Sequence, residues 1–271
     1  MSQKALLALC VALILPVASY FLVKGISADT LHMPKHFYAE DTKDTLINGK
    51  LHSDTIWHQV ANFELTNQLG QKVRMDDMRG KIIIANYFFT RCPSICPALT
   101  RNMKMIQDGL KLRDITKRID TTFVQLLSFS VDPERDSVPV LKAYADRNGV
   151  NHDMWWMLTG PKKTIYDYAL NELKLGLQDG GQVDSAFIHT EKFIMIDKRG
   201  VIRGYYNGLD NASLSKLAED LTLLMLEKDK GEKSPILAKL LGLWPVYLIA
   251  IVILAVFVRI TRKPNKKQSN A

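Results

Sequence analysis

The chain has 271 residues, a formal net charge of +8 and three cysteines. This length allows one or two domains, and so few cysteines exclude a disulfide-rich scaffold or a four-cysteine zinc site. The charge does not indicate nucleic-acid binding, because five of the eight net positive charges lie in residues 259–271 and no basic stripe of the kind that follows phosphates is present elsewhere.

Each end of the chain carries an uncharged apolar stretch, at residues 5–23 and 240–258. A spanning helix needs ~20 apolar residues, whereas a secretory signal has an apolar core of ~7–15. We therefore predict an N-terminal transmembrane anchor within residues 1–24 and a C-terminal transmembrane helix at 240–258. A cleaved signal ending near Ala28 is the alternative for the first stretch.

The predicted spans divide the remaining chain into segments. Residues 25–55 are polar without sustained periodicity and predict a juxtamembrane linker, residues 56–230 a globular domain, and residues 231–239 a second linker. The tail 259–271 is basic, and basic residues favour the cytoplasmic side of a membrane. Both termini are therefore predicted in the cytoplasm, with the domain on the other side and the lipid bilayer as a partner.

Predicted strands and helices alternate along the globular domain. A strand at 62–66 turns through 67–70 toward a partner at 72–75, and the apolar run 81–89 predicts a strand buried on both faces. The elements that follow are a helix with Leu99, Met103, Ile106 and Leu110 on one face, a strand at 122–131, a helix from Ser137 to Arg147, a strand at 154–158, a helix at 164–174, a hairpin of 193–197 with 201–206, and a last helix capped by Ser213. This order predicts an α/β fold with a mostly parallel sheet flanked by helices.

Cys92 and Cys96 directly follow the strand predicted at 81–89, at the start of a helix. Sites in such sheets lie at the carboxyl ends of strands, and a helix N-terminus stabilises a thiolate over a thiol. Three intervening residues allow both sulfur atoms to face one ion or to close a disulfide. Because thiolates are soft ligands that select Cu(I), the pattern indicates copper binding or thiol–disulfide exchange. Two buried structural cysteines are the remaining alternative.

His189 favours the copper alternative. Thioredoxin-like enzymes carry a cis-proline in the loop before the hairpin strand, where it faces the thiol pair, but this chain has no proline between Pro161 and Pro235. The sequence there is Phe187-Ile188-His189-Thr190. An imidazole that faces two thiolates completes a three-coordinate copper site and can also hold Cu(II).

Residues 57–229 resemble the Sco/SenC family of copper chaperones. The resemblance rests on three segments: 89–97, which contains Cys92-Pro93-Ser94-Ile95-Cys96-Pro97; 130–136, Ser-Val-Asp-Pro-Glu-Arg-Asp; and His189-Thr190 followed by Phe193-Ile194-Met195-Ile196-Asp197. It implies a thioredoxin-like fold with Cys92, Cys96 and His189 as the copper ligands. Two features depart from the family. Ile188 stands where many members have an aspartate, which removes a carboxylate that could tune the ligands, and a second predicted span follows the domain.

The resemblance implies a membrane-anchored copper metallochaperone, not an enzyme in the usual sense. Its main partner would be the copper-bearing subunit of cytochrome c oxidase, and other copper chaperones or thiol reductants would be further partners. Its cofactor would be a copper ion, either Cu(I) or Cu(II). The alternative is a thiol–disulfide oxidoreductase in which Cys92 attacks and Cys96 resolves. A thiol peroxidase, with Arg91 beside the nucleophile, ranks below both.

The start of the chain favours one of two kinds of membrane without deciding between them. Asp29, Glu40, Asp41 and Asp44, with few arginines, fit a mitochondrial transit peptide badly. We therefore expect a bacterial inner membrane, with the domain in the periplasm.

Overall fold

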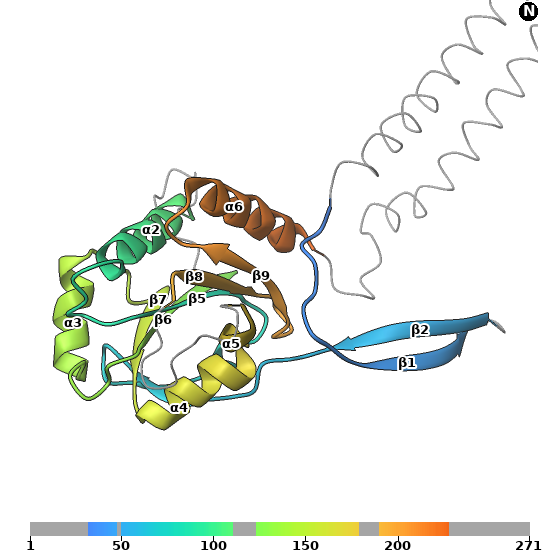
Figure 1. The fold of residues 1–271 in the computed structure, drawn as a ribbon, viewed down its shortest axis with the longest axis horizontal. Helices are drawn as coiled ribbons and strands as arrows, with labels where there is room; N and C mark the ends of the chain where they lie inside the picture. Colours follow the sequence, from blue (N-terminus) through green and yellow to red (C-terminus); the bar gives the residue numbers. More distant parts are fainter. Residues whose placement is uncertain (1–31, 48–49, 111–122, 179–189, 228–271) are drawn as a thin grey trace, which may run out of the picture. The chain divides into compact units, whose positions relative to one another are not determined.

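The computed structural model describes residues 32–47, 50–110, 123–178 and 190–227. Both predicted transmembrane segments and His189 lie outside these residues. Within them, no helix has the length and apolar character needed to cross a bilayer. Residues Met33–Glu227 form one compact unit, whose described residues are drawn in colour in Figure 1.

A seven-stranded sheet, in the order β4-β3-β7-β6-β5-β8-β9, forms the centre of this unit. Its strands are β3 (Glu64–Asn67), β4 (Lys72–Arg74), β5 (Ile82–Phe88), β6 (Val124–Ser130), β7 (Trp155–Thr159), β8 (Lys192–Ile196) and β9 (Ile202–Asn207). Only the β5–β6 and β6–β7 pairs of these strands are parallel, whereas the β3–β4, β3–β7, β5–β8 and β8–β9 pairs are antiparallel. The prediction of a mostly parallel sheet is therefore wrong. The sheet is mixed, because β3–β4 and β8–β9 enter it as hairpins instead of through crossover helices.

Helices cover both faces of the sheet. The helical elements are η1 (Met75–Met78), α2 (Cys96–Gly109), α3 (Val138–Arg147), α4 (Lys162–Asp167), the π-helical turn η2 (Tyr168–Glu172), α5 (Leu175–Gln178) and α6 (Asn211–Leu226). Side chains of α2, α3 and α6 share one apolar core with Ile82 and Ile84 of β5. Those of α4, η2 and α5 share the other core with Ile83 and Ala85. Successive residues of β5 thus enter opposite cores, which confirms the prediction of a strand buried on both faces.

The start of α6 differs from its prediction. The residue that caps this helix is Asp210, not Ser213. The Asp210 side chain accepts a hydrogen bond from the Ser213 backbone N–H at 2.8 Å. The Ser213 hydroxyl instead accepts the backbone N–H of Asn207 at 2.8 Å, so it ties the end of β9 to the helix.

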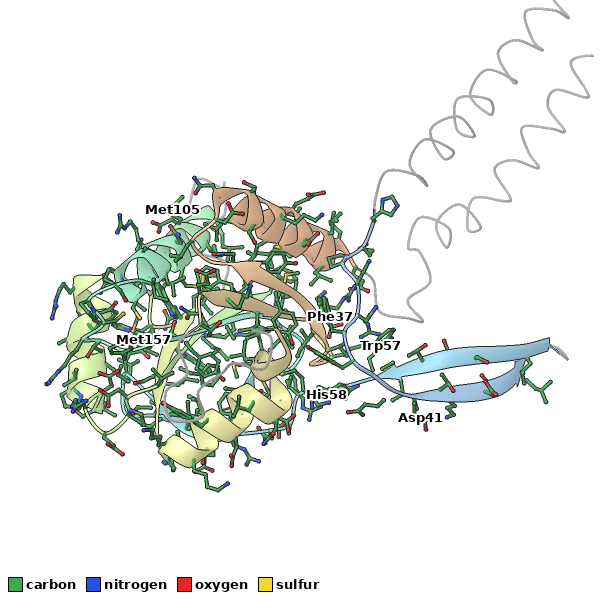
Figure 2. All side chains as sticks on the ribbon, viewed as in Figure 1. Phe37, Asp41, Trp57, His58, Met105 and Met157 are labelled. Atoms are coloured by element: carbon green, nitrogen blue, oxygen red, sulfur yellow. The ribbon has the colours of Figure 1, made fainter. Side chains whose placement is uncertain are left out.

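A two-stranded hairpin, β1 (Ala39–Ile47) with β2 (Lys50–Trp57), precedes the sheet. Residues 25–55, predicted as a juxtamembrane linker, thus contain most of this hairpin. Leu46 and Leu51 face each other across the strands yet are exposed, so the described side chains form no buried face that would impose the apolar alternation that signals a strand. At the base of the hairpin, labelled by His58 in Figure 2, the His58 Nδ1 atom lies 2.6 Å from Glu40 Oε1.

The two ends of the compact unit meet at Arg203, whose side chain is fully buried. Its guanidinium donates to the Pro34 carbonyl oxygen at 2.7 Å, to Glu227 Oε2 at 2.6 Å and to Asp197 Oδ2 at 3.1 Å. One arginine thus joins the segment before β1, the turn after β8 and the end of α6.

Candidate functional site

The two cysteines lie where β5 passes into α2. Cys92 is in the turn after the strand, and its backbone N–H donates to the Phe89 carbonyl at 3.3 Å. Cys96 is the first residue of α2 and is followed by Pro97, which has no N–H to leave unpaired in the first turn. The predicted position of the pair, at the carboxyl end of a core strand and at the start of a helix, is confirmed.

Both cysteines are free thiols in largely buried positions. Cys92 is 7% exposed and Cys96 is 3% exposed, so Cys92 is the more exposed of the two residues. The Cys92 Sγ atom lies 3.5 Å from the Ser94 hydroxyl. The ring of Phe88 packs on that of Tyr144 with centroids 5.6 Å apart, and burial, followed by the charges of Cys96 and Cys92, raises the pKa of Tyr144. Phe88 and both cysteines belong to one apolar core, against which Tyr144 packs.

The two thiols have very different acidities. Burial raises the pKa of Cys92, but hydrogen bonds from the side chains and backbone N–H groups of Ser94 and Cys96 outweigh it and lower the pKa to about 6. Burial, followed by the hydrogen bond to Cys92, raises the pKa of Cys96 to about 12. The pair titrates as a unit, so near pH 7 it carries one negative charge, held mainly by Cys92.

We expect alkylation of Cys92 to follow this acidity. The thiolate is the reactive form, so the rate with iodoacetamide should rise as the pH rises through about 6, while Cys96 stays unmodified. The reaction is quenched at each pH, and peptide mass spectrometry measures the alkylation rate of each cysteine. The urea-unfolded chain is the control, in which the rate for both cysteines should rise with a midpoint at about pH 8.5. A midpoint in the folded protein equal to that of the unfolded chain would contradict the account.

A buried carboxylate, that of Asp136, holds the loop that leads to the thiols. It accepts hydrogen bonds from the Thr90 backbone N–H at 3.2 Å, the Thr90 hydroxyl at 2.5 Å and the Ser130 hydroxyl at 2.6 Å. In the same turn, Arg135 forms an ion pair with Asp132 at 3.2 Å. The bonds of Asp136 to Thr90 were not predicted, because the sequence places these residues far apart.

Asp136→Asn is expected to lower the free energy of unfolding by roughly 2 kcal/mol. The amide nitrogen of asparagine is a donor and would face a donor of Thr90 or Ser130 in a site that is 1% exposed. Urea denaturation measures the change. Asp132→Asn is the matched control, because its partner Arg135 is 66% exposed and such pairs contribute ~1 kcal/mol or less. Equal losses in the two variants would show that Asp136 has no special structural role.

The start of β8 lies beside the first turns of α2. β8 is antiparallel to β5, with Ala85 opposite Ile194, so its first residue lies at the sheet end where β5 leads to Cys92. The backbone N–H of Gly208 donates to Glu191 O at 2.7 Å. A Cβ atom on Gly208 would lie 2.6 Å from Leu99 Cδ2, one turn after Cys96. The predicted ligand His189 lies outside the described residues, and Thr190, the next residue, is buried.

The described residues place two candidate metal donors together, the sulfur atoms of Cys92 and Cys96. Among these residues, no group of three or more His, Cys, Asp and Glu side chains could hold a metal ion. His58 and His152 lie 2.6 Å from Glu40 and 3.0 Å from Asp146 respectively, so each has a carboxylate partner.

Comparison with known proteins identifies relatives of this domain. A family model described as SCO1/SenC matches residues 55–225. The SCO1 protein homolog of Bacillus subtilis is 31% identical over 174 residues, which cover 64% of this chain and 86% of that protein. A SCO1/SenC family lipoprotein from Bacillus anthracis matches with a TM-score of 0.51 and 28% identity, over 62% of this chain and 95% of the solved one.

A second solved structure, BsSco, matches with a TM-score of 0.51 and 32% identity, over 63% of this chain and 95% of the solved one. It is described as a member of the Sco family of cytochrome c oxidase assembly proteins with a disulfide switch. These structures confirm the predicted thioredoxin-like fold. The match of the family model extends over more than half of the chain, and this protein therefore belongs to the SCO1/SenC family.

Proposed function

We propose that this protein is a membrane-anchored copper metallochaperone that delivers copper to cytochrome c oxidase during its assembly. One observation carries the proposal: a member of the SCO1/SenC family holds two free thiols together at the start of α2. Thiolates are soft donors, and Cu(I) is the soft ion they suit best. Sco proteins of Arabidopsis thaliana and Bradyrhizobium japonicum have been solved with copper bound.

Cys92 and Cys96 supply two sulfur donors, and we propose His189 as the third ligand. His189 stands three residues before β8 in the sequence, and β8 begins at the sheet end where β5 leads to Cys92. Because Cys92 already favours the thiolate, binding a cation there requires the loss of only one further proton, from Cys96. Release to an acceptor with its own thiols would exchange these ligands one at a time.

The membrane anchor belongs to the same proposal. The apolar stretches 5–23 and 240–258 flank the domain, and with the domain in the periplasm of a bacterial inner membrane both termini would be cytoplasmic. Tethering to the bilayer that contains the acceptor raises the effective concentration of the thiol site near it.

A second function, thiol–disulfide exchange, is supported by the separation of the two pKa values. The Cys92 thiolate would attack a disulfide of the partner and form a mixed disulfide, and Cys96 would then displace the partner's second sulfur. The chain would end with a Cys92–Cys96 disulfide and the partner with two thiols, so two electrons and two protons pass to the partner. BsSco, 32% identical, is described as having a disulfide switch.

Mixing with the soluble copper-bearing domain of the oxidase subunit separates the two functions. In the first mixture, the copper-loaded fragment 33–227 meets an acceptor whose own cysteines are reduced. In the second mixture, the copper-free fragment meets an acceptor whose cysteines form a disulfide. A metallochaperone transfers its copper in the first mixture, measured by metal analysis of the separated proteins. An oxidoreductase instead reduces the acceptor in the second, measured by mass spectrometry. If no copper moves in the first mixture, the metallochaperone proposal is wrong.

A further inference from the structure

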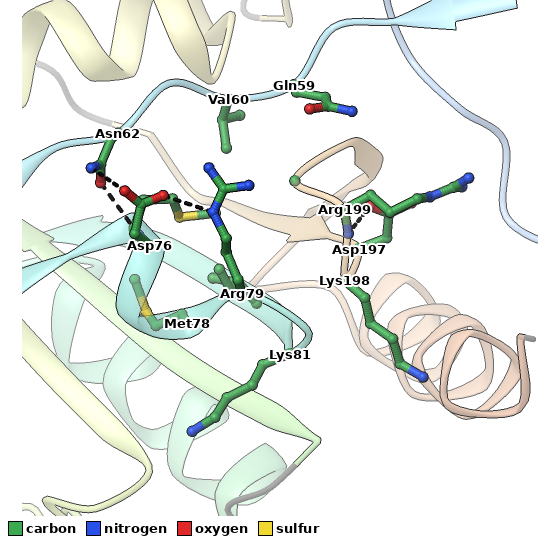
Figure 3. Close-up of a pocket in the computed structure, with 13 residues that line it drawn as sticks. Gln59, Val60, Asn62, Asp76, Met78, Arg79, Lys81, Asp197, Lys198 and Arg199 are labelled. Atoms are coloured by element: carbon green, nitrogen blue, oxygen red, sulfur yellow. Dashed lines mark hydrogen bonds and ion pairs between the residues drawn. The ribbon is translucent and has the colours of Figure 1, made fainter. Parts of the chain in front are cut away.

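Four basic residues lie around a pocket at the end of the sheet opposite the thiols: Arg79, Lys81, Lys198 and Arg199. We call them the basic end. Lys81 immediately precedes β5, while Lys198 and Arg199 form the turn between β8 and β9. The backbone N–H of Gly80 donates to the Lys198 carbonyl at 3.2 Å, so the two segments are joined into one surface (Figure 3).

The positive charge of the basic end is only partly neutralised. Arg79 Nε lies 2.7 Å from Asp76 Oδ1, and an Arg199 nitrogen lies 3.3 Å from Asp197 Oδ2. In the described part of the chain, no carboxylate forms an ion pair with Lys81 or Lys198, whose side chains extend away from the pocket in Figure 3. Among the described residues, the surface therefore offers two half-buried lysines without an acidic partner and the two exposed guanidinium groups to an anionic partner. The Lys81 ammonium also donates to Gln125 Oε1 at 3.4 Å.

An exposed aromatic ring lies next to this charge. Phe123, at the start of β6, is 44% exposed, and its carbonyl oxygen accepts the backbone N–H of Ile82, the residue after Lys81, at 2.8 Å. Aromatic rings at the headgroup level and basic residues at the membrane surface are both typical of protein parts that contact a bilayer.

Both ends of the compact unit leave it beside the basic end. Arg203 binds Pro34 and Glu227 and shares the Asp197 carboxylate with Arg199. Only the stretches 25–32 and 228–239 separate these ends from the predicted spans, and a chain extends at most ~3.5 Å per residue. In an anchored protein, the shorter stretch allows at most roughly 28 Å between the domain and the span, so the basic end can reach the headgroups, where the surface potential of anionic lipids acts over about one Debye length, ~8 Å.

We propose that the basic end docks on the anionic phospholipid headgroups of the membrane that anchors the chain. The inference rests on the membrane anchoring in the proposed function but not on copper. β5 has seven residues and runs from Lys81 toward Cys92. At ~3.3 Å per residue, a docked domain can hold the thiols up to about 20 Å farther from the headgroups than the basic end. The docked domain therefore presents its thiols to an acceptor outside the bilayer.

Vesicle co-sedimentation of the fragment 33–227 tests the inference, because this fragment contains both apolar cores and lacks the predicted spans. We expect binding to vesicles of phosphatidylcholine with phosphatidylglycerol, no binding to phosphatidylcholine alone, and a loss of binding at high salt. The double variant Lys81→Glu/Lys198→Glu should lower the partition coefficient at least ~20-fold, since each lysine near the surface contributes about 5-fold.

Lys162→Glu/Lys163→Glu is the matched control, with the same change of charge in the first turn of α4, where acidic residues are favourable. It should bind like the unchanged fragment.

Lys81→Gln/Lys198→Gln, which introduces no repulsion, replaces Lys81→Glu/Lys198→Glu if that variant does not fold. Equal loss in the control, equal binding to both lipids, or no binding at low salt would overturn the inference. So would displacement by inorganic phosphate at constant ionic strength, which would indicate a phosphate pocket. Copper transfer is measured separately, so failure here leaves the proposed function intact.

Discussion

Cys92→Ser and Cys96→Ser are each expected to abolish retention of Cu(I) by the fragment 33–227. A serine hydroxyl is a hard, weakly acidic donor, so either change removes one of the two soft ligands that the structure brings together. Loss of a residue that merely supports a metal ligand costs ~10–100-fold in affinity. Loss of a ligand should cost on the order of 10³-fold or more. Competition with a strong Cu(I) chelator, read as copper remaining on the protein, measures the change.

Ser94→Ala is the matched control for the cysteine variants. Ser94 lies between the two cysteines and contacts the Cys92 sulfur at 3.5 Å, but it is not a proposed ligand. Its loss should raise the pKa of Cys92, because a hydrogen bond that stabilises the thiolate is removed, and should weaken copper binding by far less than either cysteine change. Copper retention by either cysteine variant at the level of Ser94→Ala would show that the thiols are not the ligands.

Arg203→Met is expected to lower the free energy of unfolding by about 3–5 kcal/mol. The change removes the fully buried guanidinium and leaves the Asp197 carboxylate, 4% exposed, with the exposed Arg199 as its remaining ion-pair partner. The Pro34 carbonyl also loses its donor. Urea denaturation gives the loss of stability, and limited proteolysis should detect earlier cleavage near Pro34, since its tie to the domain is gone.

Arg79→Met serves as the control for Arg203→Met. Arg79 is 79% exposed and pairs with the half-exposed Asp76, so its removal should cost ~1 kcal/mol or less. If Arg203→Met costs no more than this control, the buried arginine does not hold the two chain ends as described.

The central strands and the thiol position could be predicted because they depend on local patterns. Continuous apolar runs signal strands buried on both faces, and β5 and β6 are such strands, with every residue buried. Leu99 and Met103 recur at helical spacing and are fully buried on α2. Once β5 and α2 are placed, Cys92 and Cys96 can lie only at their junction.

Other features could not be predicted because they depend on contacts between distant parts of the chain. In the sequence alone, Arg203 would be placed at the surface of a hairpin. In the structure it binds the carbonyl of Pro34, which is 169 residues away. Asp136 meets Thr90 across 46 residues. The β1–β2 hairpin is held by strand pairing, and none of its side chains whose burial the structure describes is buried, so neither composition nor periodicity indicates it. The direction of β8 against β5 is likewise a tertiary choice.

X-ray absorption spectroscopy of the Cu(I)-loaded fragment 33–227 tests the central claim most directly, because it reports the atoms bound to the metal. We predict one copper per chain with two sulfur ligands and one imidazole nitrogen. In His189→Ala the nitrogen should be lost and the two sulfur ligands kept, whereas Cys92→Ser should leave no copper on the protein. A fragment that retains no copper, or copper bound only by nitrogen and oxygen, would contradict the account.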